Sequence, residues 1–350
     1  MQETPGLDLD RVLPWLHERT EIKGEVQACV IAGGRSNLTF LLSVDGESRY
    51  VLRRPPLKRL HPGAHNVARE YRVMDALQGH VPLPRTLGLC EDDEITGAPF
   101  YVVDFVPGRT LRTVDDACEL GTPGHLAAVV GKTLGTLHRV APAITGREPQ
   151  RGWDFTARQL QVWGRQIESP DGRPLPLMLE VRDRLAADIP AQRTVAIVHG
   201  DFRLDNLRIA DDGAVLAILD WELWTLGDPL ADLGISLSYW LDPGAVLVPL
   251  GDSPTLASIG SRDQLTRAYA EVTGWDLEEG ERAFYLAFAD WRFAAILEGV
   301  YQRHLAGAYG ETPGEHWREL EHIVPALAEQ AAQTLGVRSA AGAGDGRTRA

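Results

Sequence analysis

The order of apolar and polar positions separates a strand-rich first part of the chain from a helix-rich remainder. Apolar residues recur at helical spacing over 8–19 and again over 66–77, so both segments are predicted helices. The dipeptide Asp45-Gly46 lies between two short apolar runs and is typical of a tight hairpin turn. Strands are predicted at 26–32, 38–44, 49–54 and 100–106. The first part is therefore expected to form a sheet with accompanying helices.

Helical spacing dominates the rest of the chain. Two short apolar runs, 195–198 and 215–219, interrupt it as predicted strands. The expected fold class is α+β, with a small β-rich N-lobe at 1–107 and a larger, mainly helical C-lobe at 108–336. The Ala- and Gly-rich end, 337–350, lacks periodicity and is expected to be a disordered tail. Helices of the second part are predicted at 126–140, 156–167, 177–187, 282–305 and 317–335.

Composition narrows the classes of partner. With 44% apolar and 24% charged residues, the chain resembles an ordinary soluble globular protein. Its net charge of −14 argues against nucleic acid as a partner, because nonspecific binding relies on Lys and Arg. The widely spaced Cys29, Cys90 and Cys118 indicate a reducing compartment and no zinc site. No apolar run is long enough to cross a membrane and the N-terminus lacks signal-peptide features, so a cytoplasmic location without a membrane partner is expected.

Three polar residues stand at the ends of the two short strands predicted in the second part. Asp201 follows the strand at 195–198, Asn206 comes five residues later, and Asp220 follows the strand at 215–219. This spacing matches a kinase catalytic loop with a metal-binding Asp downstream. Asp201 is the candidate catalytic base for the attacking hydroxyl, and Asn206 and Asp220 are the candidate ligands of Mg²⁺. The competing interpretation is a structural turn whose Asp residues cap helices.

The residues around this motif resemble one family of small-molecule kinases. The pattern His199-Gly-Asp-x-x-x-x-Asn206, followed by Asp220-Trp-Glu, resembles the aminoglycoside phosphotransferase family. It is most similar to the branch that includes the kinase-like domain fused to acyl-CoA dehydrogenases, and the likeness extends over residues 7–335. The resemblance implies a bilobal, protein-kinase-like fold. It also implies that ATP and Mg²⁺ are the cofactors and that a small-molecule hydroxyl is the phosphoryl acceptor.

Two segments are candidates for backbone contacts to the nucleotide. The glycine-rich turn between the first two predicted strands would place N–H groups and a hydroxyl over phosphates. The end of the strand at 100–106 matches the connection between the lobes, and the resemblance implies that its backbone hydrogen-bonds adenine. The candidate residues of the two segments are Gly34, Ser36, Asn37, Asp104, Phe105 and Val106.

One strand carries an arginine where protein kinases have a phosphate-binding lysine. Strand alternation puts Arg53 on one face of the sheet and turns Arg54 away from it. Glu70, in the following predicted helix, is the natural partner of Arg53. Arginine supplies the same charge and can contact phosphate with two N–H groups, although it is not interchangeable with lysine. The alternative is that Arg53 and Glu70 are surface charges.

Several residues near the catalytic motif have predicted structural roles. Asp228 and Pro229 are expected as the N-cap and first residue of a helix. Asp232, one turn further on, is expected to tie this helix to the catalytic loop. His199 is expected to orient the loop by hydrogen bonding, and Asp205 to support it.

The acceptor and two competing functions stay open at this stage. The branch resemblance points to a hydroxyacyl-CoA-like compound or another hydroxylated metabolite, with an aminoglycoside as a further candidate. A protein kinase is disfavoured because only residues 221–227 separate Asp220 from the next predicted helix, which is too short for an activation loop. A catalytically weak, nucleotide-binding regulatory protein is disfavoured because Asp201, Asn206 and Asp220 are all present.

Overall fold

The structure is a computed structural model whose contacts divide the chain into two compact units. It describes residues 6–20, 22–31, 37–56, 66–120, 123–148, 154–168, 172–240, 259–307 and 316–337. The first unit comprises 1–110, 143–147 and 206–224, and the second comprises 111–142, 148–205 and 225–350. The first contains an antiparallel sheet and the second is mainly helical, which confirms the predicted α+β class. The last predicted segment, the tail, lies outside the described residues from 338 onward.

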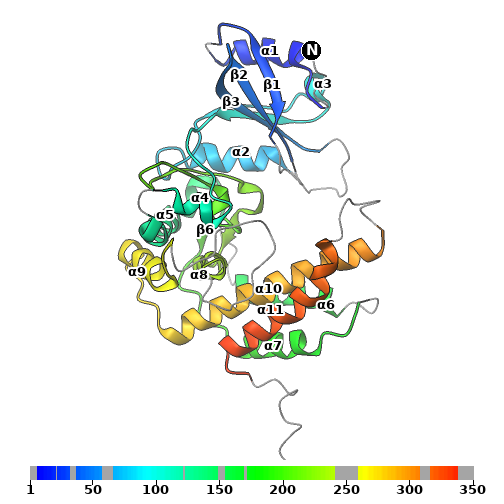
Figure 1. The fold of residues 1–350 in the computed structure, drawn as a ribbon, viewed down its shortest axis with the longest axis vertical. Helices are drawn as coiled ribbons and strands as arrows, with labels where there is room; N and C mark the ends of the chain where they lie inside the picture. The colour runs from blue at the N-terminus through cyan, green and yellow to red at the C-terminus, as the bar shows by residue number, and fades with distance from the viewer. Residues whose placement is uncertain are drawn as a thin grey trace, which may run out of the picture. The chain divides into compact units, whose positions relative to one another are not determined.

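A five-stranded antiparallel sheet forms the centre of the first unit (Figure 1). Its strands are Val26–Val30 (β1), Leu38–Val44 (β2), Glu47–Arg54 (β3), Thr86–Cys90 (β4) and Phe100–Asp104 (β5). Their order across the sheet is β1-β2-β3-β5-β4. The predicted hairpin turn is confirmed, since Asp45 and Gly46 have φ angles of 50° and 83° between β2 and β3. β4 was not among the predicted strands, because its Thr-Leu-Gly-Leu-Cys sequence offers only a short run interrupted by Gly88.

One face of the sheet is covered by α1 (Leu9–His17), whose N-cap is Asp8. The apolar residues of α1 pack against buried side chains from four strands, so this face forms a hydrophobic core. Trp15 meets Phe100 edge to face with ring centroids 5.0 Å apart. A Cβ atom at Gly88 would lie 2.8 Å from the Trp15 ring, so the close approach of helix and strand requires glycine there.

The opposite face carries α2 (Val67–Ala76), which is capped by Asn66. Residues alternate along β3, so the side chain of Arg53 lies on the α2 side. Arg54 lies on the other side and donates from Nη1 to the carbonyl of Thr96 at 2.6 Å. The predicted opposite orientation of Arg53 and Arg54 is confirmed.

The first unit also contains a short hairpin, which is flanked by the candidate residues Asn206 and Asp220. β7 (Leu207–Ile209) and β8 (Val215–Ile218) are antiparallel, and η4 (Trp221–Leu223) follows them. The smaller elements of this unit are α3 (Asp93–Thr96) and η2 (Pro142–Thr145). The hairpin lies beyond the predicted boundary at residue 107, yet its contacts are with the unit that contains the sheet.

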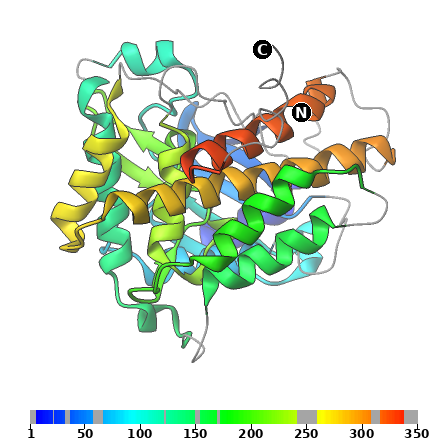
Figure 2. The ribbon, with the colours of Figure 1, turned by 90° about the horizontal axis from the view of Figure 1, so that it is seen from below.

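Packed helices form most of the second unit, and Figure 2 shows α10 running beside α6, α7 and α11. The helices are α4 (Val114–Cys118), α5 (Leu126–Arg139), α6 (Phe155–Ile167), α7 (Pro176–Ala187), α8 (Pro229–Ser238), α9 (Arg262–Thr273), α10 (Glu279–Leu305) and α11 (Leu320–Thr334), with the short turns η1 (Pro123–His125), η3 (Leu204–Asn206) and η6 (His316–Glu319). A Cβ atom at Gly234 of α8 would lie 2.3 Å from the carbonyl oxygen of Tyr285, so α8 and α10 approach closely only with glycine there. Among the described residues, no helix combines the length and hydropathy needed to span a bilayer.

Two short strands and a capped helix hold the catalytic segment of the second unit. β6 (Ala196–Val198) pairs with β9 (Thr225–Gly227), and all three residues of β6 are buried. Asp228 caps α8 by accepting from the N–H of Leu230, and Pro229 is the first helical residue, as predicted. Tyr285 also donates its hydroxyl to Asp228 at 2.7 Å, so the start of α8 is fixed from two directions.

Candidate active site

The loop after β6 is held by a buried carboxylate from α8. The N–H groups of His199 and Gly200 donate to the two carboxylate oxygens of Asp232, at 2.7 and 2.9 Å. Gly200 has a φ of 85°, a left-handed conformation that favours glycine. This conformation explains why glycine stands where protein kinases carry arginine. The predicted tie between Asp232 and the catalytic loop is confirmed.

Asp232 is itself supported by a chain of polar groups. The Nε2 atom of His138 lies 3.2 Å from Asp232, and its Nδ1 atom lies 2.9 Å from the hydroxyl of Tyr269. Burial alone would raise the pKa of Asp232, but His138 and His199 hold that pKa below its usual value. The loop is therefore anchored to an ionised carboxylate whose own position is fixed.

Asp201 presents its carboxylate at the end of this anchored loop, with a side chain that is 25% exposed. Its N–H donates to Nδ1 of His199 at 3.3 Å, which is the orienting role predicted for that histidine. Arg203 donates from Nε to Asp201 at 3.1 Å and also pairs with Asp205 at 2.9 Å. Tyr239 donates its hydroxyl to the other oxygen of Asp201 at 3.5 Å. The carboxylate is thus contacted by Arg203 and Tyr239 and still reaches solvent.

Arg292 is a cation of the second unit that interacts electrostatically with Asp201 and was not predicted from the sequence. Arg292 projects from α10, and the charges of Asp201 and Asp232 act on it. Its Nε atom is buried and has no hydrogen-bond partner among the residues that the structure describes. Burial lowers the pKa of Arg292. Nothing in the sequence singled out this arginine from others on a long helix. The roles of Arg203 and Tyr239 were also missed, although the position of Arg203 between Asp201 and Asn206 was a signal for it.

In the first unit, the β7–β8 hairpin brings Asn206 and Asp220 to adjacent backbone positions. Asn206 precedes β7 and Asp220 follows β8, and the N–H of Leu219 donates to the carbonyl of Asn206 at 2.8 Å. Asp220 has φ 61° and ψ 64°, a left-handed conformation that is strained for a residue other than glycine. The hairpin therefore brings the backbones of Asn206 and Asp220 together, and their binding of Mg²⁺ stays a prediction.

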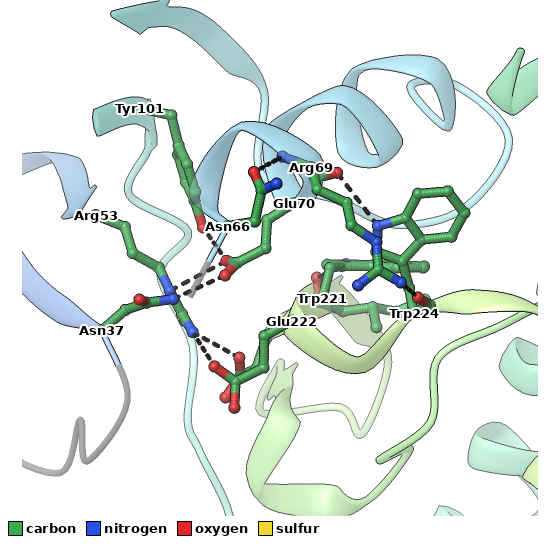
Figure 3. Close-up of polar contacts among 11 residues, drawn as sticks. Asn37, Arg53, Asn66, Arg69, Glu70, Tyr101, Trp221, Glu222 and Trp224 are labelled. Carbon is green, nitrogen blue, oxygen red and sulfur yellow. Dashed lines mark hydrogen bonds and ion pairs between the residues drawn. The ribbon is translucent and has the colours of Figure 1, made fainter. Parts of the chain in front are cut away.

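Arg53 lies at the centre of a cluster of carboxylates in the same unit (Figure 3). Its Nε atom is 3.1 Å from Glu70, and its Nη2 atom is 2.7 Å from Asp220 and 3.6 Å from Glu222. The predicted contact between Arg53 and Glu70 is present, and the interpretation of both as surface charges is wrong, since their side chains are 13% and 2% exposed. The sequence marked Glu222 only as an acidic neighbour of Asp220 that would suit an aminoglycoside, and its contact with Arg53 was not predicted.

Glu70 is enclosed by further polar side chains. Tyr101 donates its hydroxyl to Glu70 at 3.1 Å, and Asn37 donates from Nδ2 at 2.7 Å (Figure 3). Burial raises the pKa of Glu70 to about 7, against the opposing effect of Arg53. Asn37, a candidate phosphate contact, is buried and supports Glu70 in this structure.

The structure describes only some of the remaining candidate residues for nucleotide binding. Gly34 and Ser36 lie outside the described residues. At the end of β5, the N–H of Asp104 donates to the backbone carbonyl of Arg85 at 2.9 Å. The N–H of the next residue, Phe105, donates to the backbone carbonyl of Arg49 at 2.8 Å. The carbonyl of Val106 accepts from Nε of Arg208 at 3.2 Å. These backbone groups are therefore engaged within the protein.

The oxygen donors of the first unit fit a magnesium ion that is shared with a nucleotide. Magnesium in kinases takes one or two protein ligands and completes its shell with phosphate oxygens and water. Asn206 and Asp220 supply such a pair, and three carboxylates around Arg53 leave a surplus of negative charge. Within the described ranges, no three His, Cys, Asp or Glu side chains form a metal site without phosphate.

Comparison with known proteins identifies the family. The sequence model of the phosphotransferase enzyme family, APH, matches residues 27–276. The chain belongs to this family. Its membership places the chain among phosphotransferases with a protein-kinase-like fold. In this APH chain, the segment between Asp220 and α8 holds only η4 and β9, which is too little for an activation loop.

Individual relatives agree with this assignment. A candidate aminoglycoside phosphotransferase from Ralstonia eutropha has a TM-score of 0.75 and 29% identity, covering 94% of this chain and 98% of that one. The GDP and kanamycin complex of APH(2″)-IIIa has a TM-score of 0.61 at 14% identity, over 93% and 99% of the two chains, and supports the fold alone. Acyl-CoA dehydrogenase family member 10 of Mus musculus is 33% identical over 335 residues, 91% of this chain. The APH chain spans 30% of the length of that relative.

Proposed function

We propose that this chain transfers the γ-phosphoryl group of ATP, bound with Mg²⁺, to a hydroxyl group of a small molecule. The observation that carries the proposal is the buried Arg53–Glu70 pair beside Asp220, which lies at the same end of one hairpin as Asn206. This is the charge pattern that phosphoryl transfer needs, a guanidinium for phosphate and oxygen donors for the metal. The chain places Asp201 only five residues before Asn206.

The first unit supplies the groups for the phosphate donor. Arg53 would bind the phosphates with its guanidinium, and Glu70 would fix the direction of that side chain. Asn206 and Asp220 would hold Mg²⁺, which when bound neutralises charge on the phosphate oxygens. Adenine would meet the backbone around Asp104–Val106, and the glycine-rich turn with Gly34 and Ser36 would cover the phosphates.

The second unit supplies the catalytic base. Asp201 would accept the proton of the acceptor hydroxyl as its oxygen forms a bond to the γ-phosphorus. The bond between that phosphorus and the bridging oxygen then breaks, and ADP leaves with the electron pair. The anchored loop around Gly200 supports this role, because positioning contributes most of the catalysis in an in-line transfer.

The surroundings of Asp201 contain two guanidinium groups, Arg203 and Arg292, beside the carboxylates of Asp205 and Asp232. Arg292, whose Nε atom has no hydrogen-bond partner among the described residues, offers a contact to an anionic group of the acceptor. The mouse relative carries the name of an acyl-CoA dehydrogenase, which is consistent with a hydroxyacyl thioester. We therefore favour a hydroxyacyl-CoA-like compound, with other hydroxylated metabolites as the wider class.

A two-part experiment tests the proposal. Calorimetry should show ATP binding that depends on Mg²⁺, and Asp220→Asn should weaken it at least tenfold. A panel of hydroxyacyl thioesters, hydroxy acids and aminoglycosides should then reveal an alcohol that stimulates ADP release. Tight ATP binding without acceptor-stimulated ADP release across the panel would favour the nucleotide-binding regulatory protein instead.

A further inference from the structure

Two arginines of the first unit stack on one tryptophan. The guanidinium carbons of Arg69 and Arg147 lie 5.1 and 4.9 Å from the ring centroid of Trp224. Trp224 follows η4 and is 2% exposed, whereas Arg147 is exposed. The arrangement therefore joins a buried ring to two cations from separate segments, and Figure 3 shows the Arg69 side of it.

Arg69 is held firmly in this position. The ring Nε1 of Trp224 donates to the backbone carbonyl of Arg69 at 3.2 Å, and Nη2 of Arg69 donates to the backbone carbonyl of Trp224. The Nε atom of Arg69 is buried without a hydrogen-bond partner among the described residues. The guanidinium is thus fixed by neutral groups, and one of its donors is left unused within that part of the chain.

Neither Arg69 nor Arg147 forms an ion pair with a carboxylate of the described residues, although the charge of Glu70 acts on Arg69. By contrast, Arg72 on the same helix as Arg69 pairs with Glu91 at 2.8 Å. Burial and the charge of Arg147 lower the pKa of Arg69. Arg69 also lies in the first turn of α2, where the helix dipole already favours an anion over a cation.

The site is separate from the carboxylate cluster around Arg53. Glu70, the next residue on α2, turns toward Arg53, while Arg69 turns toward Trp224 (Figure 3). Successive residues on an α-helix point about 100° apart, so one helix serves both places. A positive pair and a negative cluster thus lie on neighbouring faces of α2.

We propose that Arg69 and Arg147 form a second anion-binding site that takes a phosphate group outside the nucleotide site. Two guanidinium groups offer several N–H donors in planar forks, which suit the oxygens and double charge of phosphate. The phosphate has two sources, a phosphate carried by the acceptor or free inorganic phosphate. The first source rests on the proposed function, because a coenzyme A thioester carries phosphate groups remote from its hydroxyl.

Calorimetry on the full chain tests the site directly. Inorganic phosphate is titrated while Mg²⁺ and a non-hydrolysable ATP analogue fill the nucleotide site. The wild type should bind phosphate, and Arg147→Gln should weaken binding about tenfold, because it removes one charge-assisted contact. Arg72→Gln is the matched control and should bind like the wild type. Absence of phosphate binding by the wild type, or equal binding by Arg147→Gln, would overturn the proposal.

Two further measurements show whether the site needs the guanidinium fork and which compound carries the bound phosphate. Arg69→Lys keeps the charge but loses the fork, so it should also weaken phosphate binding, and an unchanged melting temperature shows that it still folds. Free coenzyme A should bind more tightly than phosphate and compete with it if the acceptor is the source. Phosphate binding that coenzyme A does not affect assigns the site to a free anion. A wild type that binds no phosphate but still turns over ATP with an acceptor overturns this inference and leaves the proposed function standing.

Discussion

The two candidate regions are built in opposite ways. Around Arg53, three carboxylates meet a single guanidinium, so the cluster has unbalanced charge. Around Asp232, backbone N–H groups and His138 satisfy a buried carboxylate within the protein itself. The first arrangement is completed by a cation, such as Mg²⁺ bound with a nucleotide, whereas the second is complete within the protein. A binding region and a positioning region therefore differ in whether the protein balances its own charges.

The largest effect is expected when the positioning region keeps its shape but loses its base. Asp201→Asn preserves the size of the side chain but cannot accept the hydroxyl proton, so acceptor-dependent turnover should fall about a thousandfold. ATP affinity, which depends on the first unit, should stay within twofold of the wild type by calorimetry. Turnover close to that of the wild type would remove Asp201 from the role of base.

Release of the loop from its anchor should cost both stability and turnover. Asp232→Asn loses the ionised acceptor for two N–H groups, and the free energy of unfolding in urea should fall by about 3 kcal/mol. Asp228→Asn is the matched control, because Asp228 caps the same helix and does not bond the loop. The control should lose stability while its remaining folded fraction turns over normally. If both variants lose turnover equally, the anchoring role of Asp232 is not specific.

A smaller effect is expected when the charge of the binding region is kept and its geometry is changed. Arg53→Lys retains one positive charge among Glu70, Asp220 and Glu222 but loses the guanidinium fork. The KM for ATP should rise about tenfold, with the melting temperature little changed. A KM equal to that of the wild type would mean that only the charge at position 53 matters.

Arg292 separates acceptor binding from donor binding. Arg292→Gln should raise the KM of an anionic acceptor about fivefold, because it removes a cation whose field reaches Asp201, and it should leave the KM for ATP unchanged. Arg282→Gln serves as the control, since Arg282 lies on α10 and pairs with Asp263. Equal acceptor KM values for the two variants would argue against an anionic acceptor.

The smallest effect concerns two carboxyls in the two units. Burial raises the pKa of both Glu70 and Asp290 to about 7, but only Glu70 has a guanidinium partner. Asp290 is bonded by Gln330 at 3.0 Å, and its Oδ1 atom has no partner among the described residues. An unfolded Asp ionises near pH 4, so the folded state binds more protons between about pH 4 and pH 7. The free energy of unfolding therefore falls as the pH rises through that window.

Asp290→Asn should reduce this pH dependence and leave the part that comes from Glu70. At pH 8 the variant should be more stable than the wild type, on the order of 1 kcal/mol, while at pH 5 the two should be similar. Urea unfolding at the two pH values measures the difference. A wild-type curve that is flat between pH 5 and pH 8 would contradict the raised pKa of Asp290.

Local sequence patterns were sufficient to predict the parts of the fold that depend on neighbouring residues. The β2–β3 hairpin follows from Asp45-Gly46, and the start of α8 follows from Asp228 and Pro229. α9 was not predicted, although Ser261 and Gln264 form a capping box and Gly274 ends the helix in the left-handed conformation. Those signals were present in the sequence and could have been used.

The sequence could not predict those parts of the candidate site that depend on contacts between distant segments. The pairing of Arg53 with Glu70 could be inferred because strand alternation and one following helix determine it. The approach of Glu222 depends on the left-handed turn at Asp220, and that of Arg292 depends on how α10 packs. Neither packing angles nor a strained φ angle leave a local pattern, so these residues could not be read from sequence.

The backbone at Asp220 bears on how this family can change over generations. A single nucleotide change in an Asp codon produces Asn or Gly, and both residues tolerate a left-handed φ better than most. Such a change removes the carboxylate that we propose as a ligand of Mg²⁺ and keeps the turn that carries it. Selection for a stable fold therefore would not oppose the loss of catalysis at this position. A single substitution at Asp220 would therefore keep the turn and yield a folded chain that lacks the proposed metal ligand.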